Sequence, residues 1–351
     1  MKIAFGVFDW GLGHATRDIP LISALLKRKD EVHIISTGRA MTLLKDYFGN
    51  KCRYFDVPSI HVPYRKNRFF ATNFWVNIPR MIYTLKKARK ITEQIIKNEK
   101  YNRVISDCRY DVYDKIENSF LINHQVRFKA LPIIQRILEG WLASRSRKYK
   151  YVIVPDFKTN NLSGELSHNL KCLLPSKIKY IGILSQLQKK KVTEDIDYFI
   201  SISGPEPQRT VLEEKIIPAL HQLSGKIVVT LGRPESKDIK FNKKIRFFSF
   251  LDSKKQGEMM NRAKFIITRS GYTTIMEIAE LNKKKVLFIP TPGQTEQEYL
   301  GNYYENKKYF HHVSQYKLNL GKDVEIARKF KGFKCPWKTE ESVKKFLEVI
   351  K

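Results

Sequence analysis

Short apolar runs rich in β-branched residues alternate with stretches of helical spacing along the chain. Runs of this kind are typical of strands covered on both faces, and helices between them indicate parallel-sheet α/β units. The pattern predicts strands at residues 3–7, 32–36, 103–106, 119–122, 151–154, 180–183, 198–201, 226–230, 245–250, 265–268 and 286–289. It predicts helices at residues 15–27, 208–223, 254–262, 272–281, 295–305 and 340–351.

The chain has 351 residues, which suits two domains that each bury a core. A basic stretch without a strand pattern, Gln186–Glu194, separates the two halves. We therefore expect an N-terminal domain at 1–188, a C-terminal domain at 189–335, and a last helix within 336–351 that packs back on the first domain. Two doubly wound, Rossmann-like domains facing a central cleft are the simplest architecture, with ligands at the carboxyl ends of the strands.

The net charge of +30 attracts polyanions such as nucleic acid, anionic lipid or phosphorylated substrates. The four cysteines stand far apart with no C-x-x-C pair, which argues against a zinc site or a disulfide framework. The N-terminus lacks the pattern of a signal peptide, and no apolar run approaches the roughly 18 residues of a membrane span. We expect a soluble protein of a reducing cytoplasm.

The segment Thr268-Arg-Ser-Gly-Tyr-Thr-Thr-Ile-Met-Glu277 runs from a buried-type strand through a small turn into a helix. The free N–H groups of such a helix start bind anions. Glu277 shares a helix face with Thr273 and Thr274. This arrangement suits a nucleotide, with the diphosphate at the turn and the ribose hydroxyls on Glu277. The alternative is an ordinary strand–turn–helix unit with a solvated glutamate.

A second candidate loop, Asp9-Trp-Gly-Leu-Gly-His-Ala-Thr-Arg17, follows the first strand. Gly11 and Gly13 allow a ligand to approach the backbone closely. A dinucleotide fingerprint would need a third glycine at Thr16 and an acid at the end of the second strand, so a nicotinamide cofactor is disfavoured. His14 is a candidate general base, with an acceptor or phosphate contact and a structural cap as alternatives.

Polar residues also follow two other strands of the first half, Ser106-Asp107-Cys108-Arg109-Tyr110 and Ile122-Asn123-His124-Gln125. Ligands bind at such strand ends in parallel sheets. His124 is therefore a second catalytic candidate, with a polar contact inside the protein as the alternative. No D-x-D arrangement is present among these carboxylates, so we infer no metal.

The segments GLGHATR, ISDCRY, SGPEPQR and RSGYTTIMEIAE…VLFIPTPGQTEQEYLGN together resemble the GT-B glycosyltransferases, and among them the MurG-like group related to glycosyltransferase family 28. The order and spacing fit over essentially the whole chain. The resemblance implies a nucleotide-sugar donor in the C-terminal domain and no other cofactor. It implies an acceptor in the N-terminal domain.

The residues assigned on the motifs and on this resemblance fall into three groups. The catalytic candidates are His14 and His124. The donor-binding candidates are Gly204, Arg209, Gly232, Arg233, Ser270, Gly271, Tyr272, Thr273, Glu277, Gln294, Gln297 and Glu298. The acceptor-binding candidates are Gly11, Gly13, Arg17, Asp107 and Arg109.

The stretch from His61 to Trp75, continued by Lys86–Lys90, mixes aromatic with basic residues. Interfacial helices use this mixture on anionic membranes, single-stranded nucleic acids are bound by a similar one, and a plain helix with core aromatics fits as well. With the resemblance, it implies a peripheral enzyme at the inner face of the cell membrane.

The expected function is transfer of a sugar, from UDP or a related nucleoside diphosphate, to a hydroxyl of a lipid-linked or glycolipid acceptor. The resemblance further implies inversion at the anomeric carbon. A sugar-nucleotide 2-epimerase would share the fold but needs several carboxylates at strand ends, and few are present. A basic nucleic-acid-binding protein is the third alternative, although no nucleic-acid motif is recognisable.

Overall fold

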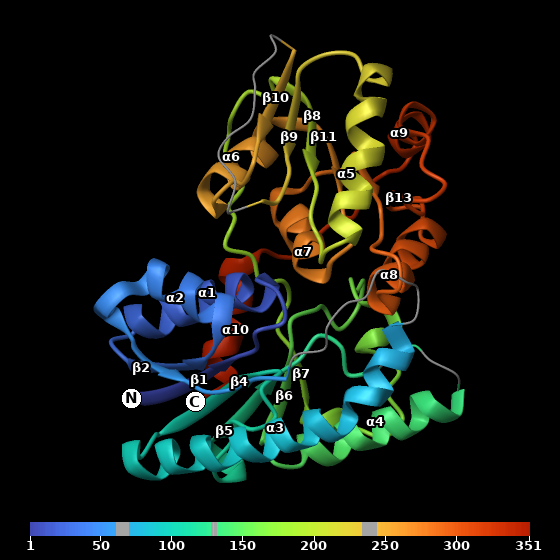
Figure 1. Cartoon of the computed structure of the whole chain (residues 1–351). Coiled ribbons are helices and arrows are strands. Elements are labelled where there is room, and N and C mark those ends of the chain that lie inside the picture. The colour runs from blue at the N-terminus through green and yellow to red at the C-terminus, as the bar shows by residue number, and fades with distance from the viewer. Residues whose placement is uncertain (61–69, 128, 130–131, 234–243) are drawn as a thin grey trace. The chain divides into compact units, whose positions relative to one another are not determined.

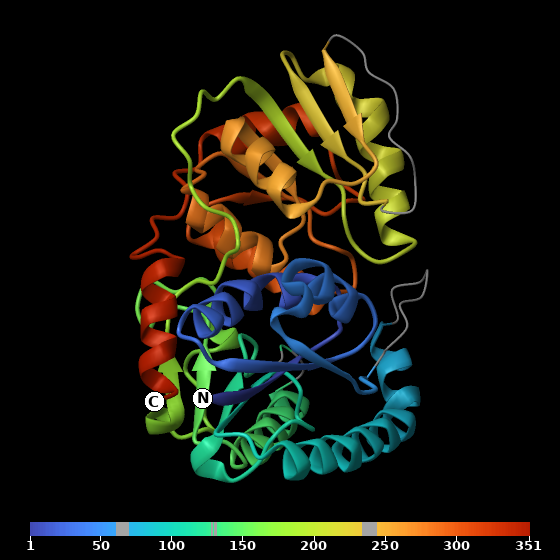
Figure 2. The same cartoon turned by 90° about the vertical axis from the view of Figure 1, so that its left-hand side faces the viewer.

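The computed structural model describes residues 1–60, 70–127, 129, 132–233 and 244–351, with only the backbone of residues 70–76, 78 and 132. Contacts divide the described chain into two compact units, one made of residues 1–60, 74–186 and 336–351 and the other of residues 70–73 and 187–335 (Figures 1 and 2). Each unit has its own parallel sheet and its own hydrophobic core.

The first unit contains a seven-stranded sheet in the order β3-β2-β1-β4-β5-β6-β7. The strand order reverses between β1 and β4, and such a reversal is where doubly wound sheets bind ligands. The strands are β1 (Lys2–Val7), β2 (Glu31–Ser36), β3 (Arg53–Asp56), β4 (Arg103–Asp107), β5 (Ser119–Ile122), β6 (Tyr151–Val154) and β7 (Ile178–Tyr180).

Helices cover both faces of this sheet. Those of the first unit are α1 (Gly13–Lys27), α2 (Gly38–Phe48), α3 (Phe70–Glu99), α4 (Pro132–Ser146) and α10 (Thr339–Val349). α1 and α2 lie on one face, while α3 and α4 lie on the other (Figures 1 and 2). The last helix, α10, packs on α1, and just before it Trp337 donates from Nε1 to the carbonyl of Ile181 at 3.1 Å.

The second unit contains a six-stranded parallel sheet in the order β10-β9-β8-β11-β12-β13, whose order reverses between β8 and β11. Its strands are β8 (Ile196–Ser201), β9 (Ile227–Thr230), β10 (Ile245–Phe248), β11 (Ala263–Thr268), β12 (Val286–Phe288) and β13 (His311–His312). Its helices are α5 (Gln208–Ala219), α6 (Ser253–Arg262), α7 (Tyr272–Leu281), α8 (Thr295–Asn306) and α9 (Leu320–Arg328). α5 and α9 bury their apolar faces in one core with the central strands.

The predicted fold class, two parallel α/β sheets, is confirmed. The predicted strand at 180–183 is displaced, because β7 starts at Ile178 and the chain leaves the sheet after Tyr180. β3 was not predicted, since its residues Arg-Tyr-Phe-Asp have exposed ends and form no apolar run. Among the described helices, none combines the length and the apolar composition needed to cross a membrane.

Candidate functional site

The glycine-rich loop after β1 is held in place by Asp9. The Asp9 carboxylate accepts a hydrogen bond at 3.0 Å from the N–H of Ala40 in the first turn of α2. Gly11 has a positive φ of 77°, which favours glycine, and a Cβ there would meet nothing within 4 Å. The loop then enters α1 at Gly13, so that His14 lies in the first turn of that helix.

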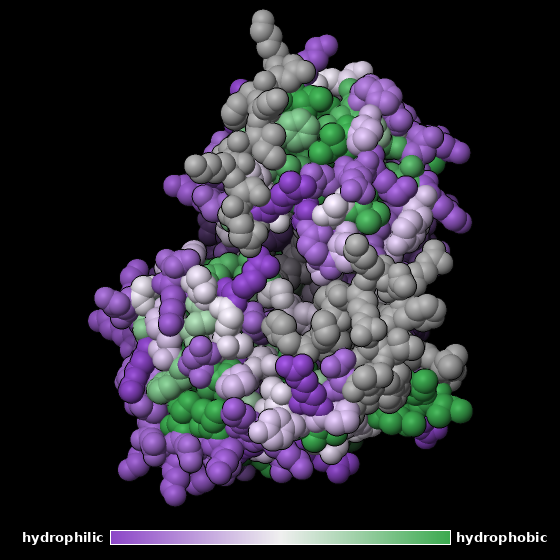
Figure 3. All heavy atoms as spheres, in the orientation of Figure 1, coloured by the Kyte–Doolittle hydropathy of each residue, from purple (hydrophilic) through white to green (hydrophobic). Residues whose placement is uncertain are grey.

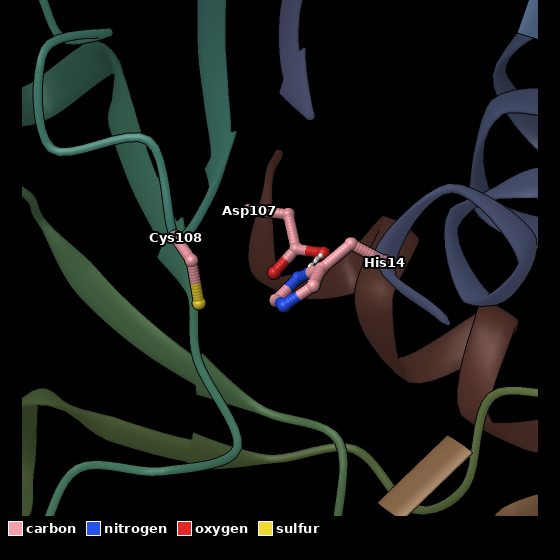
Figure 4. Close-up of side chains that lie close together, drawn as sticks. All are labelled: His14, Asp107 and Cys108. Atoms are coloured by element: carbon pink, nitrogen blue, oxygen red, sulfur yellow. Dashed lines mark hydrogen bonds and ion pairs between the residues drawn. The ribbon is translucent and has the colours of Figure 1, made fainter. Parts of the chain in front are cut away.

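His14 meets the end of the neighbouring strand. Val7 of β1 pairs with Asp107, the last residue of β4. The His14 Nδ1 atom lies 2.8 Å from Asp107 Oδ2, and Figure 4 shows the imidazole and the carboxylate in contact. No described residue hydrogen-bonds the His14 Nε2 atom, and the side chain is 13 % exposed. The ring therefore offers one nitrogen to a ligand.

Arg17, one turn further along α1, joins the same cluster. Its Nε donates to Asp107 Oδ2 at 3.0 Å, and its Nη2 donates to Asp107 Oδ1. Its Nη1 lies 2.7 Å from Nδ1 of His124. The structure thus brings together four residues predicted from three separate motifs, at the point where the strand order reverses.

Burial and charge set the protonation of this cluster. Although burial favours the neutral carboxyl, the charges of Arg17 and His14 hold the pKa of Asp107 well below its usual range. Burial lowers the pKa of His14 below 6.5, against the opposing charge of Asp107. Burial and the Asp107 charge raise the pKa of Asp18 well above its usual range. At neutral pH the cluster therefore contains an ionised Asp107 and a neutral His14, and burial favours the neutral form of Asp18.

In the part of the chain that the structure describes, His14, Asp107 and Cys108 have ligand atoms within 4.8 Å of one another, as a metal site would require (Figure 4). The donor set does not suit a metal ion. The Arg17 guanidinium already binds both Asp107 oxygens, so a cation would face a fixed positive charge. Burial also raises the pKa of the Cys108 thiol, which keeps it from becoming a thiolate ligand or nucleophile.

Arg109 does not join the cluster. It is 1 % exposed, and its guanidinium binds both carboxylate oxygens of Asp111 at 2.8 and 2.7 Å. Its remaining N–H groups donate to the carbonyls of Val57 and Pro58. Its guanidinium thus connects the end of β4 to the segment after β3, and the acceptor contact expected of Arg109 stays a prediction.

In the second unit, the predicted anion turn lies after β11. Gly271 is the N-cap of α7, and no side chain caps the first turn of this helix. The Ser270 hydroxyl donates to the carbonyl of Gln297 at 2.9 Å, which brings the turn beside the start of α8. Tyr272 is buried and Thr273 is half-buried. A helix start without a side-chain cap is suited to a phosphate.

Glu277 lies in the second turn of α7 and is 6 % exposed. It has no hydrogen-bond partner among the described residues, and burial alone raises its pKa from 4.5 to about 7. A solvated glutamate, the alternative considered above, is excluded by this burial. Ile275 and Ile278 are buried in the core, as expected for the opposite face of the helix.

The predicted residues Gln294, Gln297 and Glu298 lie together at the start of α8. Gln297 Oε1 accepts from the N–H of Thr291 at 2.9 Å, and its amide donates to Gln294. Glu298 accepts from the N–H of Gly293 at 3.0 Å. These three side chains therefore shape the loop between β12 and α8, beside Ser270.

Arg209 and Arg233 share Glu213. Arg209 Nη1 lies 2.5 Å from Glu213 Oε2, and Arg233 Nη2 lies 2.6 Å from Oε1 of the same carboxylate. Glu206 binds Arg209 as well, at 2.5 Å. Because acidic partners match both charges, the diphosphate contact expected of these arginines stays a prediction.

Two glycines flank this group. Gly232 has a φ of 64°, and a Cβ on it would lie 2.6 Å from the carbonyl of Ile202. Gly204 has a φ of 121°, and its Cβ would approach Arg269 Nε at 3.7 Å. The tight fit at Gly232 explains why a small residue follows β9.

Arg269, which the sequence interpretation did not single out, is buried directly before Ser270. It donates to the carbonyls of Ser203, Gln208, Ile289 and Pro290 and to the side chain of Gln315, all neutral acceptors. Burial lowers its pKa to about 9. Arg269 thus connects the loops after β8, β11 and β12 by hydrogen bonds. No described carboxylate forms an ion pair with its guanidinium. Its position in the sequence, between a buried strand and the Ser270-Gly271 turn, could have identified it as a candidate.

Two family models match the chain. Residues 1–130 match glycosyl transferase family 1, and residues 207–331 match the glycosyltransferase family 28 C-terminal domain. A search of curated protein sequences finds no significant match.

Three solved structures illustrate the fold. MurG of Acinetobacter baumannii is 14 % identical with a TM-score of 0.61, covering 99 % of each chain. SnogD of Streptomyces nogalater is 12 % identical with a TM-score of 0.60, also covering 99 % of each chain. The spinosyn rhamnosyltransferase SpnG complexed with thymidine diphosphate is 11 % identical with a TM-score of 0.65, covering 99 % of this chain and 96 % of that one.

The burial of Glu277 predicts a pH-dependent gain in stability for Glu277→Gln. The fold favours the neutral carboxyl, so its contribution to stability is present below pH 4.5 and is lost as the pH rises through about 7. Glutamine resembles the neutral form, so the variant should be more stable by roughly 3 kcal/mol at pH 8 and by little at pH 4.5. Urea unfolding at both pH values measures the difference; an equal gain at both would contradict the burial argument.

Proposed function

We propose that this chain, a glycosyltransferase of the GT-B fold with a family 28 type C-terminal part, transfers a sugar from a nucleoside diphosphate to an acceptor hydroxyl. UDP is the first nucleotide to test, because the chain resembles MurG-like enzymes. The observation that carries the proposal is the pairing, on α7, of a helix start without a side-chain cap and a buried carboxylate that no described residue hydrogen-bonds.

The second unit has the features that a nucleoside diphosphate requires. The N–H groups at the start of α7 would bind the diphosphate, and the cation of Arg269 lies directly behind the Ser270 turn without a carboxylate to match it. Glu277 would accept hydrogen bonds from the ribose hydroxyls, which are the partners its carboxylate lacks in this structure. Gln294, Gln297 and Glu298 would face the sugar.

The first unit supplies the base. In the reaction, the acceptor oxygen forms a bond to the anomeric carbon while the bond from that carbon to the diphosphate oxygen breaks. The acceptor proton moves to Nε2 of His14, and Asp107 stabilises the resulting imidazolium through Nδ1. Direct displacement of this kind inverts the anomeric centre. The leaving diphosphate is stabilised by N–H groups and arginine, so the proposal requires no metal.

The acceptor that we propose is lipid-linked or a glycolipid, and the enzyme would act as a peripheral protein on the inner face of the cell membrane. The side chains of residues 61–76, on which the aromatic part of this inference rested, lie outside the described residues. α4 offers independent support. Ile133, Ile137 and Trp141 are 77, 65 and 40 % exposed and recur every four residues, so they share one face.

Basic residues accompany this apolar stripe. Arg136 and Arg145 belong to α4, and the Arg145 guanidinium lies 5.5 Å from the centre of the Trp141 ring. Figure 3 shows hydrophobic surface at the end of α4. Exposed aliphatic and aromatic side chains among cations are typical of helices that lie on anionic membranes.

A thermal-shift panel of UDP-, GDP-, dTDP- and CDP-sugars tests the donor, and Glu277→Ala tests its site. We expect one nucleotide class to stabilise the wild-type chain. Loss of a charge-assisted hydrogen bond should weaken that binding by about 10- to 100-fold, or roughly 1.5–3 kcal/mol.

Glu258→Ala is the matched control, because Glu258 is an exposed glutamate of α6 that pairs with Arg262. It should leave nucleotide affinity unchanged. Unaltered affinity in Glu277→Ala would refute the ribose contact. Binding of nucleic acid with a steep salt dependence, and of no nucleotide sugar, would refute the enzyme proposal.

His14→Ala should reduce turnover far more than donor affinity. A positioned general base contributes about 10²–10⁴-fold to the rate, whereas the donor residues belong to the other unit. Steady-state kinetics and nucleotide titration of the same preparation separate the two effects. His221→Ala, which removes an exposed histidine after α5, should change neither value. Wild-type turnover in His14→Ala would show that His14 is not the base.

Replacement of Ile133, Ile137 and Trp141 by serine should weaken binding to anionic vesicles. Each cation near an anionic surface adds about 1 kcal/mol that salt screens, while the apolar stripe adds attraction that salt does not screen. Co-sedimentation should therefore show salt-resistant binding for the wild-type chain only. Equal binding of both proteins at high salt, or of neither at low salt, would exclude α4 as a membrane contact.

A further inference from the structure

The two histidines of the first unit differ in what binds their Nδ1 atoms. Nδ1 of His124 lies 2.7 Å from Arg17 Nη1. A guanidinium only donates hydrogen bonds, so this nitrogen must accept. The proton of the neutral His124 ring is therefore on Nε2, and a nitrogen that already holds a proton cannot take another from an acceptor hydroxyl.

His14 faces both members of the ion pair at once. Its Nδ1 lies 2.8 Å from Asp107 Oδ2 and 2.9 Å from Arg17 Nη2. A carboxylate only accepts and a guanidinium only donates, so a single Nδ1 satisfies one of them. If Nδ1 carried no proton, its lone pair would face a lone pair of the Asp107 carboxylate and repel it. Arg17 Nη2 does not depend on Nδ1 as an acceptor, because it already donates to Asp107 Oδ1. The charge-assisted bond to the carboxylate prevails, and Nδ1 of His14 carries the proton.

We propose that the Arg17–Asp107 ion pair holds the two histidines in opposite tautomers, so that His14 alone presents an unprotonated Nε2 and Arg17 is the positioning residue that distinguishes them. Only one consequence of this inference, that His14 is the base, rests on the proposed function. The tautomers themselves are properties of the isolated chain.

The charges around His14 add a second consequence. The groups that face it are Asp107 at the end of β4, Arg17 on α1 and His124 after β5, with Asp18 and Cys108 close behind. Burial lowers the pKa of His14, Asp107 raises it, and the charge of Arg17 lowers it again. Burial raises the pKa of Asp18 and that of Cys108, which favours the neutral form of each. Without the cation of Arg17, Asp107 would keep His14 protonated to a higher pH.

Two-bond ¹⁵N–¹H correlation spectra of the histidine rings test the tautomers directly in the wild-type chain. The signals are assigned from those that disappear in His14→Gln and His124→Gln. We expect the ring hydrogen on Nδ1 in His14 and on Nε2 in His124. The same tautomer in both rings, or the reverse assignment, would overturn the inference. Opposite tautomers in a chain that transfers no sugar would support it while refuting the proposed function.

The pH dependence of kcat/KM tests the role of Arg17. In Arg17→Met, the acid limb of the profile should move to higher pH by about one unit or more, because a neighbouring charge shifts a pKa by this amount. Arg17→Lys keeps the charge, so its acid limb should stay near that of the wild type. A purely structural role would lower kcat/KM by the same factor at every pH, and that result would overturn the assignment.

Arg127→Met is the matched control for loss of a buried arginine, since Arg127 pairs with Glu139 outside the cluster. It should leave the acid limb in place. If Arg17→Met does not fold, the lysine variant still decides the question: an acid limb displaced as far as one unit in Arg17→Lys would contradict an effect of charge.

Discussion

The buried ion pair between Arg17 and Asp107 is the contact on which the first unit's site depends. Its existence requires the parallel register that sets Val7 beside Asp107, and the spacing of one helical turn between His14 and Arg17. An unpaired charge at either position would cost several kcal/mol, because both side chains are almost fully buried. The pair, in turn, orients two imidazoles by their Nδ1 atoms, so that geometry and proton positions follow from one interaction.

The second unit also buries an arginine at the point where its strand order reverses, but it balances that arginine differently. Arg269 donates to carbonyl oxygens and to Gln315, while Arg17 binds a carboxylate. The neutral partners of Arg269 leave a net positive charge behind the Ser270 turn, whereas the charge of Arg17 is balanced by Asp107. An anion is therefore favoured at the start of α7, whereas the His14 cluster suits a neutral hydroxyl. The order of both sheets reverses near the middle. The two sites differ in charge because Arg17 has an acidic partner, whereas Arg269 has neutral partners.

Much of this organisation could be predicted from the sequence, and the failures have physical causes. Apolar runs identified most strands, because strands covered on both faces need them, but β3 and β13 are a polar edge strand and a strand of two residues. The motifs singled out His14, Glu277 and the Ser270 turn as candidate site residues. Pattern alone did not show that Asp111, two residues on, binds the guanidinium of Arg109. The link from Arg17 to His124 spans 107 positions and follows from strand order, which the motifs do not contain.

The proposed function would explain Glu277, a residue that stability alone would not favour. A buried carboxylate without a hydrogen-bond partner is destabilising in its charged form, and its raised pKa measures that penalty. Ile275 and Ile278 stabilise α7 from the opposite face, so the helix does not need the carboxylate for packing. The penalty is removed only when hydroxyl donors reach Glu277. A ligand that brings two adjacent hydroxyls together with a diphosphate satisfies both the carboxylate and the helix start, and a nucleoside diphosphate has that combination.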